Sequence, residues 1–143
     1  MDAYVDTSAL AKWYLNENRS DEFVAWLRET APAAISSLTV LEMRSLLARR
    51  RREGELNFRQ EAKTFAVFEE DIAHGHLTRY PVENNHFPAA VRLIASQPDQ
   101  PLRSLDALHL TLARELKAHE LATADRVMAR AAEAMGFAVV RFD

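Results

Sequence analysis

Cysteine is absent from this 143-residue chain, and glycine and proline are scarce, with three and five residues. Without cysteine, the chain has no disulfides, no zinc–thiolate sites and no thiol nucleophiles, which fits a reducing cytoplasm, where we expect the protein. Few glycines and prolines beside a hydrophobic content of 48% exclude a disordered chain. We therefore expect a compact, helix-rich globular protein with a single domain over residues 1–143.

Long apolar runs and a strong excess of basic charge are missing too. No stretch approaches the roughly 20 apolar residues that span a bilayer, and no basic segment followed by an apolar core opens the chain, so we expect neither a membrane helix nor a signal peptide. The net charge of −3 differs from the basic footprint of most nucleic-acid-binding proteins. Setting four metal-bound carboxylates aside changes it to +1, so the net charge does not exclude nucleic acid as a substrate.

Short and long apolar segments alternate along the chain. The short segments have the character of strands and lie at residues 3–5, 33–37, 77–82, 120–124 and 138–142. The long segments have helical spacing and are clearest at residues 38–52, 57–73, 86–96 and 104–116. Such alternation is typical of a parallel sheet that is covered by helices on both faces. The sequence therefore predicts an α/β fold with a central, mostly parallel sheet of short strands.

Asp6 follows the first apolar segment, in the stretch Ala3-Tyr4-Val5-Asp6-Thr7-Ser8. Open α/β sheets bind their ligands outside the carboxyl ends of their strands, which makes Asp6 a candidate site residue. Asp is also a common N-cap, so Asp6 could instead begin the helix that follows. The stretch by itself leaves both interpretations open.

Glu42 is the second unusual carboxylate. Leu38 and Leu46 lie four positions on either side of it, which puts Glu42 in an apolar stripe of the predicted helix over residues 38–52. A carboxylate is costly there unless it is paired or bound to a metal ion. The alternative is a glutamate at the flank of the helix that reaches water or pairs with a neighbouring arginine.

Asp106 and Asp125 complete a set of four. Asp106 falls in the first turn of a predicted helix for which Ser104 is a suitable N-cap, and it could be there only to meet the helix dipole. Asp125 ends the predicted strand over residues 120–124. All four acids can converge at one edge of the sheet, where they would repel one another unless a cation were bound. Oxygen ligands without cysteine or a histidine cluster favour Mg²⁺ or Mn²⁺.

Four consecutive arginines, Arg49 to Arg52, close the helix over residues 38–52. They point all round the helix axis, so they cannot form one face. A basic helix end is usually solvated and favoured by the dipole, but contact with phosphates or an acidic partner is also possible. His74 and His76 flank a glycine and have no third ligand nearby in sequence, so we interpret them as loop residues.

The four acids lie in segments that resemble, in order, the motifs of PIN-domain ribonucleases, and most closely those of VapC-type toxins. These segments are Asp6-Thr7-Ser8-Ala9-Leu10, Ser37-Leu38-Thr39-Val40-Leu41-Glu42, Ser104-Leu105-Asp106-Ala107-Leu108-His109-Leu110 and Thr123-Ala124-Asp125. The resemblance implies a PIN-like three-layer α/β/α fold and an acidic metal site. Its residues would be Asp6, Glu42, Asp106 and Asp125, with Ser8 and Thr123 as hydrogen-bonding supports.

The resemblance implies Mg²⁺-dependent hydrolysis of RNA phosphodiesters, with Mn²⁺ as a substitute. We expect Asp6 and Asp106 to bind the metal ion directly or through water. Glu42 would take a proton from the attacking water and Asp125 would hold a second ion or outer-shell waters, and these two roles are interchangeable. Because four carboxylates and one Mg²⁺ leave a charge of −2, we also expect either a second cation or one acid with a raised pKa.

The resemblance also implies partners: a homodimer, and a cognate VapB-type antitoxin that inhibits the enzyme. Arg44, Arg49 and Arg50 are candidates for contact with RNA or with the antitoxin. One alternative is a PIN nuclease of RNA processing or decay that is not a toxin. The other, from a different class, is a non-catalytic RNA-binding or scaffold module in which the acids are structural caps.

The sharpest structural expectation concerns the start of the first helix. We expect Thr7 and Ser8 to cap this helix and to support the site, while Asp6 faces the cation.

Overall fold

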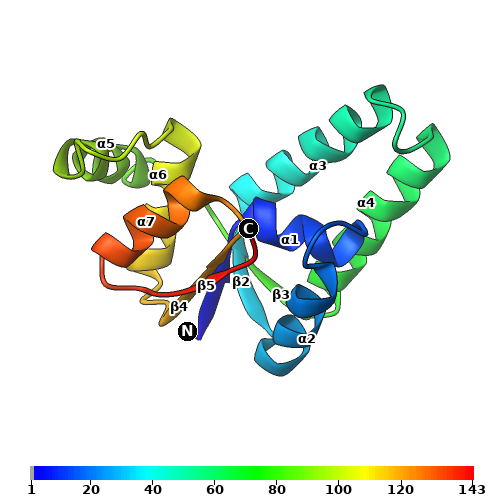
Figure 1. Ribbon diagram of the computed structural model, residues 1–143, viewed down its shortest axis with the longest axis horizontal. Coiled ribbons are helices and arrows are strands. Elements are labelled where there is room, and N and C mark those ends of the chain that lie inside the picture. Colours follow the sequence, from blue (N-terminus) through cyan, green and yellow to red (C-terminus); the bar gives the residue numbers. More distant parts are fainter. Residues whose placement is uncertain (1) are drawn as a thin grey trace.

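A computed structural model describes residues 2–143, and strands and helices alternate along most of the chain (Figure 1). The elements follow in the order β1 (Ala3–Val5), α1 (Thr7–Tyr14), α2 (Ser20–Thr30), β2 (Ala33–Ser36), α3 (Ser37–Arg52), α4 (Phe58–Ala73), β3 (Leu77–Tyr80), α5 (His86–Ser96), α6 (Ser104–Glu115), β4 (Glu120–Thr123), α7 (Arg126–Ala134) and β5 (Ala138–Arg141). None of these helices is long and apolar enough to cross a membrane.

The five strands form one parallel sheet in the order β3-β2-β1-β4-β5. The first strand is therefore central: Tyr4 lies opposite Ala34 of β2 on one side and Leu121 of β4 on the other. The chain builds outward from β1 to β3 in one direction and from β4 to β5 in the other. The strand order thus reverses between β1 and β4, and this is where open α/β sheets form their binding crevice.

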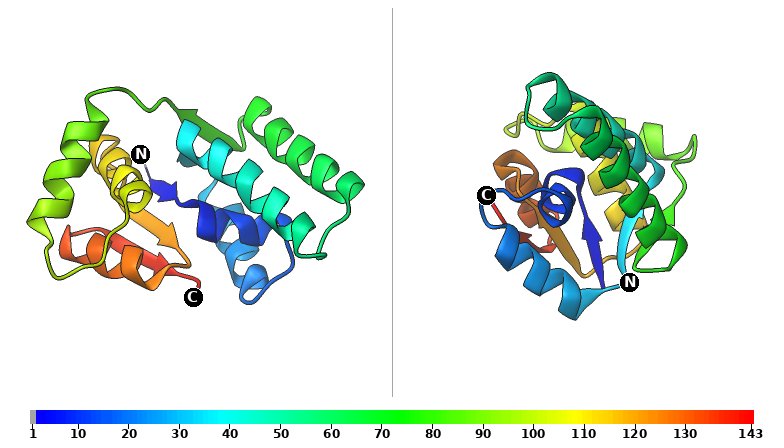
Figure 2. Two further views of the ribbon diagram at one scale, coloured as in Figure 1. Left: turned by 90° about the horizontal axis from the view of Figure 1, so that it is seen from above. Right: turned by 90° about the vertical axis from the view of Figure 1, so that its right-hand side faces the viewer.

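Helices cover both faces of the sheet, which gives three layers (Figure 2). Successive side chains of a strand point to opposite faces. In β1, Tyr4 packs in a buried cluster with residues of α6 and α7, whereas Val5 packs in a second cluster with residues of α1 to α4. The predicted α/β fold, with a parallel sheet of short strands between helices, is confirmed, and all five strands are parallel.

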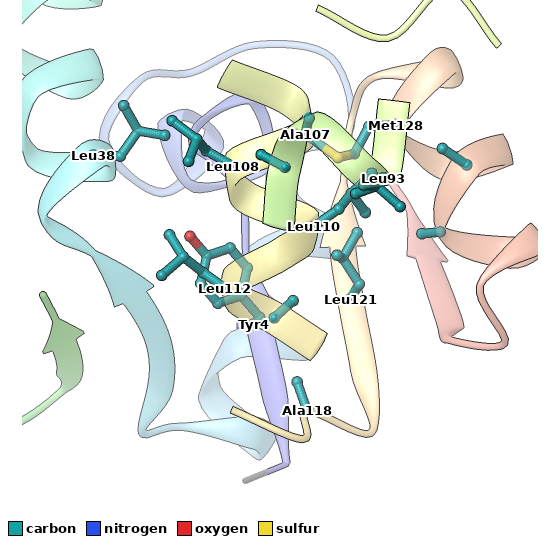
Figure 3. Close-up of a cluster of buried hydrophobic side chains, with 14 of the residues drawn as sticks. Tyr4, Leu38, Leu93, Ala107, Leu108, Leu110, Leu112, Ala118, Leu121 and Met128 are labelled. Carbon is teal, nitrogen blue, oxygen red and sulfur yellow. The ribbon is translucent and has the colours of Figure 1, made fainter. Parts of the chain in front are cut away.

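In the cluster that contains Tyr4, side chains of α6 pack against the middle strands of the sheet (Figure 3). Leu110 and Leu112 of α6 and Leu121 of β4 are all at most 2% exposed. Burying one such leucine contributes about 1.5–3 kcal/mol. The packing fixes the position of α6, which carries Asp106 in its first turn.

Two details of the helix ends correct or extend the sequence-based expectations. The N-cap of α6 is Arg103, not Ser104, because Ser104 already has helical geometry. The helix α7 ends before Gly136, whose φ of 91° is the left-handed conformation that glycine adopts without strain. The helices α3 and α4 form an antiparallel pair, which Figure 1 shows side by side.

Candidate active site

Asp6 lies directly after β1 and caps α1. Its Oδ1 atom accepts hydrogen bonds from the backbone N–H of Ala9 at 3.0 Å and from the Ser8 hydroxyl at 2.7 Å. Its Oδ2 atom accepts one from the Thr123 hydroxyl at 2.6 Å. The expectation that Thr7 and Ser8 would cap the helix in place of Asp6 is therefore wrong. One oxygen of Asp6 serves the cap, and the other is directed to β4.

Burial makes the Asp6 charge costly. The residue is 3% exposed, and none of the ion pairs among residues 2–143 involves it. Desolvation raises the pKa of Asp6, although the hydrogen bonds from Thr123, Ala9 and Ser8 and the nearby His109 oppose this shift. A buried carboxylate that lacks a cationic partner is a strong candidate for binding a cation.

Thr123 joins Asp6 to Asp125. While its hydroxyl donates to Asp6, it accepts the backbone N–H of Asp125 at 3.0 Å. Asp125 itself caps α7, because its Oδ1 atom accepts the N–H groups of Val127 at 2.8 Å and Met128 at 3.2 Å. The Oδ2 atom of Asp125 is left over from the cap and lies 3.3 Å from the guanidinium of Arg103.

Asp106 meets the same arginine. Its Oδ2 atom lies 3.3 Å from the backbone nitrogen of Arg103 and 3.3 Å from Nε of the same residue. The first contact helps to cap α6, and the second is an ion pair. Arg103 therefore bridges Asp106 and Asp125, two acids that lie 19 positions apart in sequence.

Glu42 lies in the second turn of α3 and points toward α1 and α6. Its Oε1 atom accepts a hydrogen bond from the Thr7 hydroxyl at 2.7 Å and lies 2.5 Å from Nε2 of His109. Partial burial by itself would raise the pKa of Glu42, but the contacts with His109 and Thr7 outweigh it, so the pKa is lowered. Neither alternative considered from the sequence, water alone or an arginine partner, describes these contacts.

Sequence reasoning assigned no role to His109, although it lies three residues after Asp106 in the same helix. The side chain of His109 is 3% exposed and connects Glu42 through Nε2 to the Tyr4 hydroxyl through Nδ1, at 2.7 Å. Tyr4 in turn lies 3.2 Å from the hydroxyl of Ser36. The available signal was spacing: Asp6 lies two positions after Tyr4, the spacing that puts side chains on one face of an extended chain, and Asp106 and His109 share one side of α6.

The amino ends of α1, α3, α6 and α7 meet at this edge of the sheet, because three of these helices follow directly on β1, β2 and β4. The exposed N–H groups of a helix start carry a partial positive charge of about half a unit, which favours nearby carboxylates. The carboxylates of Asp6 and Asp125, which cap α1 and α7, are stabilised by this partial positive charge. The arrangement lets several carboxylates lie close together without a separate basic residue for each.

A pocket of about 470 Å³ opens beside Glu42 and Asp106, and Arg49 and Arg103 line it with them. Three other arginines of α3, Arg44, Arg50 and Arg51, form ion pairs elsewhere. Arg50 forms ion pairs with two glutamates at 2.8 Å. Arg51 lies 3.2 Å, and Arg44 3.6 Å, from the buried carboxylate of Glu61 on α4. Of the three arginines expected to contact RNA or an antitoxin, Arg49 is the one that lines this pocket.

The comparison with protein families decides the relationship of the chain. The family model described as the PIN domain matches residues 3–134. The chain belongs to the PIN domain family. The match spans all four acids and the strands β1 to β4, and it ends before β5. No curated protein matches the chain.

Solved structures share the fold of this PIN domain at low sequence identity. The VapC20 toxin of Mycobacterium tuberculosis, described as cleaving the sarcin–ricin loop, has a TM-score of 0.74 at 17% identity, with 95% of this chain and 96% of that chain covered. VapBC2 of Rickettsia felis, bound to a promoter DNA fragment, has a TM-score of 0.70 at 14% identity over 100% of both chains. FitAcB of Neisseria gonorrhoeae has a TM-score of 0.67 at 18% identity, covering 99% and 96%.

The donor set of this PIN domain suits a hard cation, but the side chains do not form a closed cage. Within residues 2–143, no three His, Asp or Glu side chains are arranged to hold a metal ion by themselves. The oxygens near the pocket are carboxylates and hydroxyls, and Asp6 lacks a cationic partner. Mg²⁺ keeps several water ligands and needs only one or two carboxylates, so an open arrangement of this kind fits Mg²⁺.

Proposed function

We propose that this PIN domain, as one domain over residues 1–143, is a metal-dependent endoribonuclease and the toxin of a VapBC-type toxin–antitoxin pair. The observation that carries the proposal is the buried carboxylate of Asp6 at the point where the strand order reverses, linked through the Thr123 hydroxyl to the backbone of Asp125. Membership of the PIN family supports nuclease chemistry. The shared fold of the VapC20, VapBC2 and FitAcB structures supports the toxin role.

The cofactor would be Mg²⁺, with Mn²⁺ as a substitute, held by Asp6 and Asp106 with help from Asp125. When bound, such an ion lowers the pKa of a water molecule and neutralises charge that develops on the phosphate. The pKa of Asp6 is raised by burial and not by the other carboxylates, so the expectation of a second cation or of one acid with a raised pKa, which came from the number of carboxylates, stays a prediction. Thr123 and Ser8 hold the Asp6 carboxylate in one orientation through their hydroxyls.

Glu42 would accept the proton of the attacking water. Its lowered pKa keeps the carboxylate ionised at neutral pH, as a proton acceptor must be. The hydrogen bonds from Thr7 and His109 both end on Oε1, so Oε2 is the oxygen that would face the water. Because His109 is itself held by Tyr4, the orientation of Glu42 is set by a buried chain of side chains.

Arg49 and Arg103 would contact RNA phosphates at the pocket that both residues line. The remaining partners follow from the proposed toxin role: a VapB-type antitoxin that inhibits the enzyme, and a second copy of the chain in a homodimer. A chain without cysteine is compatible with the cytoplasm, where such a toxin would meet its RNA.

Cleavage of RNA by the purified protein tests the enzyme. We expect end-mapping to reveal discrete cuts in total RNA with Mg²⁺ or Mn²⁺ and none with a chelator. Asp6→Asn should abolish the cuts, whereas the matched control Asp99→Asn, in an exposed loop, should cleave as the wild type does. Folded wild-type protein that cleaves no RNA with either ion would favour the non-catalytic RNA-binding or scaffold module.

Expression in cells tests the toxin role. Induction of the wild type should stop growth, and co-expression of a small protein encoded beside its gene should restore it. Growth that continues while RNA is cleaved in vitro would instead support a PIN nuclease of RNA processing or decay.

A further inference from the structure

Arg103 is a cation that the protein itself places between two of the acids. Its Nε atom lies 3.3 Å from Oδ2 of Asp106, and its Nη2 atom lies 3.3 Å from Oδ2 of Asp125. Its backbone is anchored at the start of α6, where the N–H group lies 3.3 Å from the same Oδ2 of Asp106. The backbone of Arg103 is thus held in place, while its long, charged side chain extends along the rim of the pocket.

The ion pairs of the Arg103 side chain are weak compared with the ion pair of Arg51. The side chain is 77% exposed, and 3.3 Å is at the long end of the range for a hydrogen bond. Arg51, by contrast, is 25% exposed and pairs with a carboxylate that is 5% exposed. An exposed ion pair is screened by water and salt, so little free energy holds the Arg103 guanidinium in place.

The guanidinium occupies the oxygens that a bound cation would need. Asp125 uses Oδ1 to cap α7, which leaves Oδ2 free of the cap, and Arg103 lies against that Oδ2. The pKa of Arg103 is raised, chiefly by Asp106 and then by Asp125, with a smaller effect from Glu42. Its charge therefore interacts with three of the four acids.

We propose that Arg103 is a displaceable counter-ion: its guanidinium neutralises Asp106 and Asp125 in the cation-free protein, leaves them when a divalent cation binds, and then contacts a phosphate of the nucleic acid. This inference rests on the proposed function, for the cation site in its first step and for the nucleic acid in its last. The side chain is long enough to serve both positions, since it is anchored at the rim and lines the pocket beside Arg49. The acids thus keep a positive charge beside them in both states.

Binding of Mn²⁺ to the full chain without nucleic acid tests the first step. Free Mn²⁺ is measured by its electron paramagnetic resonance signal for the wild type, Arg103→Gln and the matched control Arg92→Gln, an exposed arginine on α5. Removing a competing exposed ion pair should lower the Mn²⁺ dissociation constant by about two- to fivefold in Arg103→Gln. The control should match the wild type. Equal or weaker binding by Arg103→Gln overturns the counter-ion role.

Binding of a labelled single-stranded oligodeoxynucleotide, a phosphate-bearing probe, tests the second step by fluorescence anisotropy. With saturating Mn²⁺, Arg103→Gln should bind the probe several-fold more weakly than the wild type and with a shallower dependence on salt. With a chelator, the two should differ less, because the acids then hold the guanidinium. An equal loss in both conditions overturns the displacement.

The two readouts separate this inference from the proposed function. Tighter Mn²⁺ binding by Arg103→Gln in a protein that cleaves no RNA supports the counter-ion and refutes the nuclease. RNA cleavage by the wild type, together with unchanged Mn²⁺ binding by Arg103→Gln, refutes the counter-ion alone.

Discussion

The Asp6→Asn substitution should stabilise the protein when no divalent cation is present. Asn is nearly isosteric with Asp and is an equally good N-cap, so its Oδ1 atom can still accept the hydrogen bonds from Ala9 and Ser8. The amide group that replaces Oδ2 can donate to the Thr123 hydroxyl. The variant thus keeps the local contacts and removes only the buried charge.

The expected size follows from two opposing effects. Burying an ion costs several kcal/mol, and each charge-assisted hydrogen bond recovers about 1–1.5 kcal/mol more than a neutral one. Three such bonds reach Asp6, and its raised pKa shows that they do not fully offset the desolvation. We expect a net gain of about 1–2 kcal/mol in Asp6→Asn, or about 3–6 °C in melting temperature.

Thermal unfolding at pH 8 with a chelator measures this difference. Saturating Mg²⁺ should reverse the order, because only the wild type gains stability from the bound ion, by about 2.7 kcal/mol at a hundred times the dissociation constant. If Asp6→Asn melts at a lower temperature than the wild type in the chelator, the reasoning is refuted, because the buried charge then does not destabilise the folded protein.

Lowering the pH provides an independent check of the sign. Because the pKa of Asp6 is raised in the folded state, the folded protein holds a proton there at pH values at which the unfolded chain has lost it. The cost of the charge is full above the folded-state pKa and disappears as the pH falls through it. The advantage of Asp6→Asn in the chelator should therefore shrink on acidification.

The remaining predictions concern the neighbouring contacts. Tyr4→Phe should lower stability by about 1–2 kcal/mol in chemical denaturation, because the buried Nδ1 of His109 loses its partner. The same variant should reduce the rate of RNA cleavage more than the affinity for RNA. An unchanged rate would contradict a positioning role for His109. Arg51→Met should cost about 1–3 kcal/mol, because the buried carboxylate of Glu61 keeps only a distant arginine; an unchanged midpoint would mean that Glu61 reaches water. Asp125→Ala should lose about 1 kcal/mol of cap energy that Asp125→Asn retains, and equal stability of the two would argue against the cap.

The layers of the fold could be predicted because they depend on local patterns. Apolar segments of strand and helix length alternate, and this alternation is enough to give a parallel sheet between two layers of helices. The strand order then determines that Asp6, at the end of β1, and Asp125, after β4, lie next to each other. The roles of the four acids in metal binding remain predictions.

The contacts between side chains could not be predicted, because they join distant parts of the sequence. Glu42 and His109 are 67 positions apart, and only the packing of α6 against the sheet brings them together. The cap interpretation of Asp6 is confirmed and leaves the site interpretation open as a prediction, because a carboxylate has two oxygens: Oδ1 caps α1, whereas Oδ2 accepts a hydrogen bond from Thr123. The bridge formed by Arg103 has no signature in the sequence either, since it depends on the rotamer of a long side chain.

The central position of β1 has a consequence for the timing of synthesis. The first strand of the chain has β2 on one edge, but its other edge stays open until β4 has been made. Ser8 and Ala9 bind Oδ1 of Asp6 from nearby in the sequence, but the hydroxyl that binds Oδ2 comes from Thr123, 117 positions later. A ribosome must deliver most of the chain before both oxygens of the Asp6 carboxylate are bound. Chains that end before β4 therefore lack the hydroxyl that binds Oδ2 of Asp6.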